Sequence, residues 1–327
     1  MNKIIFLFFV SLFSSNISFS QSNHSYSTLI NEALDLFDKQ EFYKSGLKFS
    51  EAFSKSSGKV VENDHYNAAC AWALANESDS SFNHLFKIAN NGMLTDLDHM
   101  LSDTDLNSMH DDSRWNEIVE MVRINKEKAD AKLDKPLVAM LDSVYQEDQQ
   151  YRMQLREIQE KYGWESDEMK AQWKIIQEKD SINEIKVTKI LDERGWLGAD
   201  IIGRQGNTAL FLVIQHANIE TQLKYLPMMR EAVKEGKASA SGLALLEDRT
   251  SLRQGGKQIY GSQIGRDNET GNYYVLPLED PDHVNEKRAE VGLGTLEDYV
   301  ARWEIKWDVE EYKKKLPEYE ALQNNKK

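Results

Sequence analysis

Apolar residues recur at intervals of three and four along most of this chain, and that spacing predicts α-helices. The two longest such patterns span residues 136–162 and 166–194, with a turn at Gly163 between them. Prolines interrupt helices, and the chain has only 5 of them among 327 residues. We therefore expect a mainly α protein in which these two patterns pack as an antiparallel hairpin of helices.

The period changes from helical to alternating near residues 257–278, which predicts one β-hairpin around a polar turn at residues 267–271. Before it we expect a glycine-rich loop at residues 198–206 and a central apolar helix capped by Asn207 or Thr208. Two more helices should follow. Short helices beginning near His283 and Leu296 should complete a domain of residues 136–310. Residues 311–327 are expected to be a solvated tail.

The first half, residues 25–124, reads as short amphipathic helices in pairs. The packing positions alternate between small and large side chains: Leu29, Ala33, Leu36, Ser45, Phe49 and Ala52, then residues 66–72, Phe82, Leu85 and Ile88. This half resembles tetratricopeptide repeats, although the final proline of the consensus is missing. The resemblance implies two helical hairpins, a capping helix that begins at Arg114, and an apolar face that needs a neighbour. Residues 125–135 should form a helical linker.

A series of glycine, aromatic and polar motifs marks the second half. They are Gly195-Trp196, Gly203 with Gly206, residues 212–217, Gln222 with Leu226-Pro227, Asp248-Arg249, Gln258 with Tyr260, Gly261 and Gln263, and residues 277–281. Together they make residues 140–299 resemble an uncharacterised bacterial domain family of unknown function. The resemblance implies a shared fold, and it supplies no catalytic residue because no activity is known for that family.

The first 20 residues have the pattern of a cleavable signal peptide. Lys3 precedes an apolar run at residues 4–13, and Ser18 and Ser20 are the small residues that cleavage before Gln21 requires. Ten apolar residues are too few to cross a bilayer about 30 Å thick. We therefore expect a protein that is exported to the periplasm or secreted, without a membrane span.

Charge and motif content limit the chemistry. Acidic residues outnumber basic ones by 54 to 40, which opposes binding to nucleic acids. The single cysteine, Cys70, cannot form an intrachain disulfide and reads as a small buried residue. Residues 198–206 lack the Lys-Ser/Thr pair of a phosphate-binding loop, and no histidine spacing is typical of a metal site. No cofactor or metal is expected.

Several polar residues occupy helix positions that should be apolar. Asp148 continues the stripe of Leu137, Leu141 and Val144, while Asp180 and Asn183 interrupt the next helix. Burying such groups costs several kcal/mol unless each finds a partner, so we expect them to be partners of one another. The candidate catalytic residues are Asp148, Asp180, His216 and Asp248. The candidate ligand-binding residues are Arg249, Gln215, Gln222, Asn183, Gln258, Tyr260 and Gln263.

These residues admit two interpretations. They could form a buried network that fixes the register of the helices, in an exported module that binds a protein, peptide or glycan in the cell envelope. Alternatively, Asp148, Asp180 and His216 could exchange protons in a metal-independent hydrolase or transferase, with Arg249 holding an anion. Whether the chain is an enzyme stays open. An open polar cluster would favour the second interpretation, and a closed, fully paired one the first.

Overall fold

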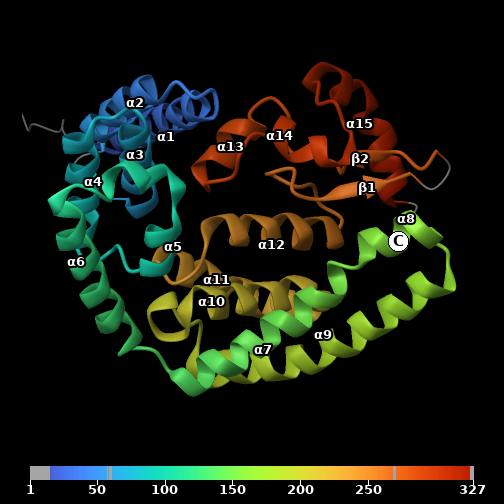
Figure 1. The fold of residues 1–327 in the computed structure, drawn as a ribbon. Coiled ribbons are helices and arrows are strands. Elements are labelled where there is room, and N and C mark those ends of the chain that lie inside the picture. The colour runs from blue at the N-terminus through green and yellow to red at the C-terminus, as the bar shows by residue number, and fades with distance from the viewer. Residues whose placement is uncertain (1–14, 57, 59–60, 268–269, 325–327) are drawn as a thin grey trace, which may run out of the picture. The chain divides into compact units, whose positions relative to one another are not determined.

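The computed structural model describes residues 15–56, 58, 61–267 and 270–324 and is mainly helical (Figure 1). It divides into two compact units, Met1–Ala131 and Lys132–Lys327. The expected signal peptide lies outside the described residues as far as position 14, and its predicted cleavage point falls within the first helix. Among the described residues, no helix combines the length and apolar character needed to cross a bilayer.

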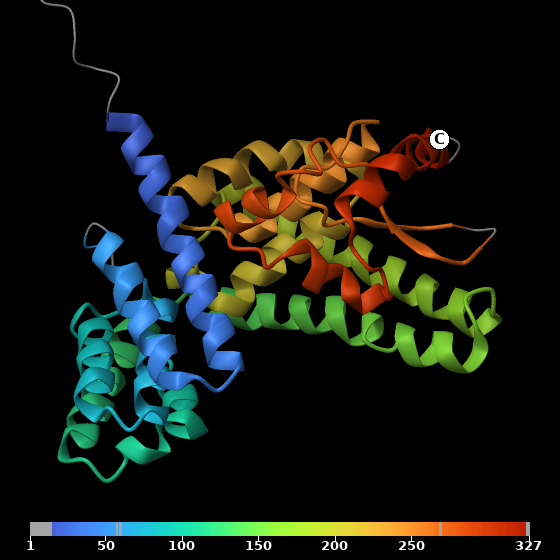
Figure 2. The same ribbon diagram turned by 90° about the horizontal axis from the view of Figure 1, so that it is seen from above.

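The first unit is a series of antiparallel helices. Helices α1 (Ser15–Asp38) and α2 (Phe42–Lys55) lie side by side, as Figure 2 shows in blue. The elements α3, α4, α5, η1 and α6 follow at Glu62–Leu74, Ser78–Asn90, Leu97–Ser102, Thr104–Met109 and Ser113–Asp130.

One buried hydrogen bond recurs in both helix pairs of the first unit. The Ser45 hydroxyl on α2 donates to the Ala33 carbonyl on α1 over 2.7 Å, and Ser81 on α4 donates to Ala69 on α3 over 2.8 Å. Small residues also allow close approach between the pairs, since a Cβ atom at Gly46 would lie 2.5 Å from the Trp72 ring. The pairs therefore repeat one packing arrangement.

The second unit is built on an antiparallel hairpin of long helices. The helices α7, α8 and α9 span Lys135–Arg152, Leu155–Tyr162 and Asp167–Arg194. They are followed by α10 (Ala199–His216), α11 (Ile219–Lys234) and α12 (Ala240–Arg253). The expected continuous helix 136–162 breaks at Met153, but this residue and Gln154 keep helical dihedral angles, so the apolar spacing continues across the break.

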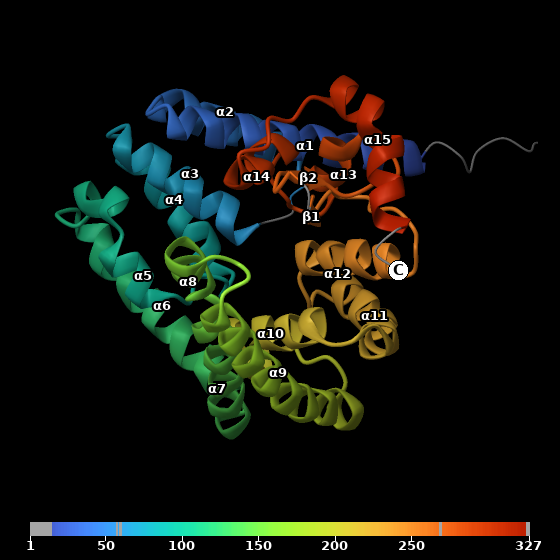
Figure 3. The same ribbon diagram turned by 90° about the vertical axis from the view of Figure 1, so that its right-hand side faces the viewer.

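A smaller layer covers α12 on the side away from α11 (Figures 1 and 3). It contains the strands β1 (Ile264–Arg266) and β2 (Tyr273–Val275), in which Gly265 pairs with Tyr274. The helices α13 (Val284–Glu290), α14 (Leu296–Val300) and α15 (Val309–Asn324) and the short turn η2 (Ala301–Trp303) complete it.

Three local expectations differ from the structure. Residues 199–206 are helical rather than a loop, with a kink at Gly203, and Gly206 brings α10 so close to α7 that a Cβ atom would lie 3.2 Å from Leu141. Asn207 does not cap a helix; its amide donates to the carbonyls of Leu197 and Lys237. The expected tail is largely α15, which packs Tyr312 into the apolar core of the smaller layer.

Two histidines of the first unit form a buried pair. The Nδ1 atoms of His65 and His84 lie 2.8 Å apart, and the Phe53 ring stacks on His65 at 4.0 Å. Burial, reinforced at His65 by the charges of His84 and Lys87, lowers the pKa of each imidazole from 6.5 to about 4. Both rings are therefore neutral in the folded protein at neutral pH.

This pair makes the stability of the first unit depend on pH. A lowered histidine pKa stabilises the fold above the unfolded value near 6.5, and that contribution is lost as the pH falls towards 4. We expect hydrogen-exchange protection of α3 and α4, corrected for intrinsic rates, to decline over this window. The decline should be smaller in His84→Gln and unchanged in His99→Gln, whose histidine is exposed. Equal declines in the unmodified protein, His84→Gln and His99→Gln would show that the His65–His84 pair does not cause the pH dependence.

Candidate functional site

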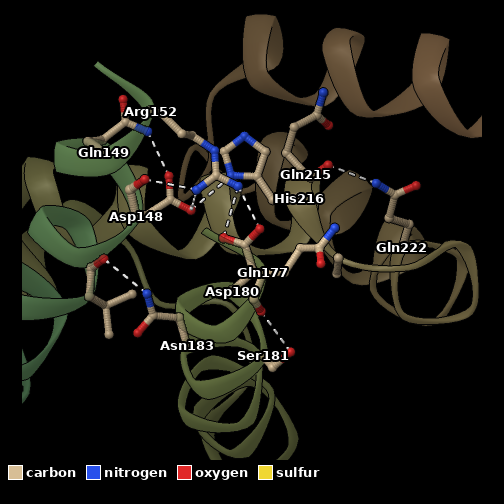
Figure 4. A network of polar contacts seen from close by, with 12 residues as sticks. Asp148, Gln149, Arg152, Gln177, Asp180, Ser181, Asn183, Gln215, His216 and Gln222 are labelled. Carbon is tan, nitrogen blue, oxygen red and sulfur yellow. Dashed lines mark hydrogen bonds and ion pairs between the residues drawn. The ribbon is translucent and has the colours of Figure 1, made fainter. Parts of the chain in front are cut away.

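Asp148 is the buried centre of a polar cluster in the second unit (Figure 4). It lies on the face of α7 that also carries Leu141 and Val144, and its side chain is only 1% exposed. The Nδ1 atom of His216 lies 2.8 Å from one of its oxygens, and the Gln149 amide donates to the other over 2.7 Å. The carboxylate is therefore buried with partners on both oxygens.

Arg152 connects Asp148 with Asp180. Its guanidinium lies one helical turn from Asp148, 3.4 Å from the nearest carboxylate oxygen, and it also donates to the Asp148 carbonyl. The antiparallel packing of α7 and α9 brings Asp180 opposite, where one Arg152 nitrogen donates to both of its oxygens over 2.9 and 2.7 Å. One arginine thus balances two carboxylates.

His216 ends α10 and presents one ring nitrogen to the protein and one to the surface. Its side chain is 19% exposed. The Nε2 atom has no hydrogen-bond partner among the described residues and is not among their buried unpaired atoms, so it reaches the surface. Because the carboxylate of Asp148 accepts from Nδ1–H, the neutral imidazole carries its lone pair on Nε2.

The surroundings of Asp148 favour its charged form. Burial alone would raise its pKa, but the hydrogen bond and charge of His216, with Arg152 and Gln149, outweigh burial and leave the pKa below its ordinary value. Asp148 therefore stays ionised at neutral pH and can stabilise a positive charge on His216.

Two groups of side chains have metal-ligating atoms close together. Asp148, Asp180 and His216 offer atoms within 4.8 Å of one another, but Arg152 already donates to the Asp180 carboxylate and forms an ion pair with Asp148, so a cation would have to displace it. Cys70, Asp103 and Asp105 form the other group in the first unit. Burial raises the pKa of the Cys70 thiol, which disfavours the thiolate that a metal requires.

Asp248 lies apart from this cluster and holds the backbone of the next segment. It accepts hydrogen bonds from the backbone N–H groups of Ile259, Tyr260 and Ser262 at 2.7, 3.1 and 3.0 Å. Its side chain is 1% exposed, and burial raises its pKa despite these donors. The geometry gives Asp248 a structural role.

Arg249, Gln215 and Gln222 secure the carboxyl end of α10. The Gln215 carbonyl accepts from the Gln222 amide over 2.9 Å (Figure 4). It also accepts from Arg249 over 2.8 Å. Arg249 also donates to the Gln263 side chain over 3.0 Å. Its pKa falls to about 10 through burial and the neighbouring charges of Arg253 and Arg152. Arg249 is therefore near the histidine end of α10, in an electropositive environment.

The remaining candidates are internal contacts. Asn183 donates to the Val144 carbonyl on α7. Gln258 is fully buried, and its amide accepts from the Gln263 N–H and donates to the carbonyls of Gln263 and Leu276. Gln258 and Tyr260 do not lie on a regular strand as predicted, because the strand begins only at Ile264. At residues 258–263, hydrogen bonds from side chains such as Gln258 take the place of the backbone hydrogen bonds between strands.

The residue that sequence reasoning missed is Arg152. Its signal was available, because Arg152 follows Asp148 by four positions and therefore lies on the same helix face. The sequence predicts that Arg249 holds an anion, whereas Arg152 is the arginine that contacts Asp148 and Asp180.

A family model matches residues 131–311 of the chain and describes a family of unknown function (DUF6624). It agrees with the resemblance inferred for residues 140–299. A comparison with curated proteins finds no match, and neither does a comparison with solved structures.

The role of Asp248 predicts a large loss of stability on truncation. Asp248→Ala should lower the free energy of unfolding by about 3 kcal/mol, because three buried or half-buried N–H groups lose their acceptor. Urea unfolding measures this loss. Asp282→Ala is the control, because its partner Lys313 is partly exposed and an exposed ion pair contributes at most about 1 kcal/mol. Equal losses in the two variants would show that the Asp248 contacts are not stabilising.

Proposed function

The chain belongs to this family of unknown function, and we propose that its second unit is a metal-independent hydrolase or transferase with His216 as the general base. The observation that carries the proposal is the orientation of the imidazole. A buried carboxylate holds Nδ1, while Nε2 has no partner in the described part of the chain and lies at the surface. This is the arrangement by which a carboxylate fixes the tautomer and orientation of a catalytic histidine.

A second Asp–His pair in the same unit shows why burial of the carboxylate is needed to orient the histidine. His283 and Asp280 also lie 2.8 Å apart, but their side chains are 56% and 52% exposed. Water screens that pair, and neither side chain is held by packing. Asp148 is held by its position in the core, so it can orient His216 before a substrate arrives.

The proposed reaction begins with proton transfer to His216. Nε2 accepts the proton of a water molecule or a substrate hydroxyl, whose oxygen then attacks the substrate. The resulting imidazolium is stabilised by Asp148 and can return its proton to the leaving group. Asp180 fixes Arg152 beside Asp148 through its paired hydrogen bonds.

The substrate is proposed to carry an anionic group close to the reacting bond. The Nε atom and one terminal nitrogen of Arg249 donate hydrogen bonds to Gln263 and Gln215. The other terminal nitrogen has no partner among the described residues and is not a buried unpaired atom. Arg253 is close enough to lower the pKa of Arg249, and it donates to the uncharged Ala217 carbonyl and Gln222 side chain, so its charge adds to the local positive potential. A phosphate monoester or diester meets these requirements.

Substitutions at the pair test the proposal. With a chromogenic panel of p-nitrophenyl acetate, phosphate and phosphorylcholine, we expect hydrolysis of an anionic member. Asp148→Asn and His216→Ala should each lower kcat/KM by about 10²–10⁴, the usual contribution of general acid–base catalysis.

The matched control for this test is His283→Ala, which removes the exposed Asp–His pair and should leave kcat/KM unchanged. Circular dichroism establishes that each variant is folded. Full activity in folded His216→Ala would eliminate His216 as the base, and a lack of turnover across the panel would count against an ester substrate.

A binding role for the first unit is a second candidate. The repeated serine–carbonyl hydrogen bond supports the tetratricopeptide resemblance, and Tyr43 and Leu47 leave an apolar strip on α2 with exposed fractions of 53% and 50%. We propose that this unit binds a protein, peptide or glycan in the cell envelope, with catalysis confined to the second unit.

Export remains a proposal that rests on the sequence. We expect a protein expressed in a bacterium with two membranes to be recovered from the periplasm with Gln21 as its first residue, as measured by mass spectrometry. Leu7→Arg should block processing, because it puts a charge in the apolar run, and Asn23→Ala should not. A cytoplasmic, unprocessed protein would contradict export.

A further inference from the structure

The second unit contains a cavity of about 470 Å³ that shares no lining residue with the Asp148–His216 site. Its walls come from β2, from the segment that follows η2 and from α15, three neighbouring elements in Figures 1 and 3. Its aromatic lining residues are Tyr273, Tyr274, Trp303, Trp307, Tyr312 and Tyr319. The volume falls within the range of about 300–1,000 Å³ that is typical of ligand pockets.

Four of these six rings are connected by direct contacts. Tyr274 stacks on Tyr319 with ring centres 4.6 Å apart, and Tyr319 contacts Tyr312 at 5.7 Å. Tyr312 in turn contacts Trp307 at 4.9 Å. Packing alone explains Tyr312, which is buried and whose hydroxyl accepts from the Leu278 N–H and donates to the Leu276 carbonyl. Packing does not account for the polar atoms of the other rings, several of which have no hydrogen-bond partner in the described part of the chain.

Several polar atoms of this aromatic lining have no partner among the described residues. Tyr274 is only 5% exposed, yet its hydroxyl is buried without a hydrogen bond. The indole N–H groups of Trp303 and Trp307 have no acceptor, and they are not among the buried unpaired atoms, so they reach the surface. The two indole N–H groups are therefore open donors that a ligand in the cavity can use.

The charged residues of the lining argue against a strongly charged ligand. Three carboxylates, of Glu304, Asp308 and Glu311, accompany two lysines, Lys306 and Lys315. Lys315 is paired with Glu311 at 2.8 Å. The signs are therefore nearly balanced, and Glu304 and Asp308 supply acceptors at an exposed rim.

We propose that this aromatic cavity binds a short neutral saccharide. A pyranose ring presents an apolar C–H face, which packs on aromatic rings, and a rim of hydroxyl groups that both donate and accept hydrogen bonds. The indole N–H groups can donate to those hydroxyls, and the rim carboxylates can accept from them. A proline-rich peptide also fits aromatic grooves, but its backbone offers carbonyl acceptors and no proline N–H, so it would leave the carboxylates unused.

Calorimetric titration of the full chain tests this site. The probes are cellotriose, maltotriose and N-acetylated chitotriose as neutral saccharides, trigalacturonate as an anionic one, and a proline decapeptide. We expect saturable binding of at least one neutral trisaccharide. Trp303→Ala should weaken it at least about tenfold, because a stacking surface and a donor are both lost. Trp173→Ala, at a partly exposed tryptophan of α9 outside the cavity, should leave the affinity unchanged.

Trp307→Phe separates hydrogen bonding from packing, because it keeps an aromatic ring and removes the indole N–H. We expect about a fivefold loss of saccharide affinity, together with a nearly unchanged resistance to urea, since this N–H has no partner among the described residues. The proposal is overturned if no neutral saccharide binds saturably, or if only the peptide or only trigalacturonate binds. It is also overturned if neither Trp303→Ala nor Trp307→Phe weakens binding while both variants remain folded.

Discussion

The polar site of the second unit depends on one buried carboxylate. Asp148 occupies an apolar helix stripe, where an unpaired charge would cost far more than a single contact returns. The neighbouring elements supply compensation: His216 from the end of α10, Arg152 from the next turn of α7 and, through Arg152, Asp180 from α9. Three helices are therefore fixed relative to one another by the need to neutralise one group, and the same need orients the histidine.

A similar constraint shapes the layer above α12. Residues 257–263 have little regular secondary structure, and the side chains of Asp248 and Gln258 satisfy their backbone groups instead of a strand ladder. This explains why an alternating sequence produced only a three-residue strand at Ile264–Arg266. Buried side chains that already bond to backbone groups cannot also bind a substrate. Asp248 and Gln258 are therefore structural residues and not parts of the proposed active site.

The two proposed sites of the second unit differ in physical character. The Asp148–His216 site is a charged network with one open nitrogen, suited to moving a proton. The cavity between β2 and α15 is aromatic and nearly balanced in charge, suited to holding an uncharged ligand. Their separation within one unit is consistent with catalysis at the first and recognition of a larger substrate or envelope component at the second.

The sequence alone determined the helical class, the long helices and the β-hairpin, because helix and strand periods are local and can be read from neighbouring residues. It also identified Asp148 and His216 as unusual, since a polar residue in an apolar stripe is visible without a structure. It did not predict that the last residues would form α15, whose stability comes from packing against the hairpin. Only the tertiary structure decided which polar residues meet: it joined Arg152 with Asp148 and Asp180, and it assigned Asp248 to backbone contacts. Those pairings connect residues that are 28 and 68 positions apart as well as close neighbours, and such contacts depend on how helices pack rather than on local sequence.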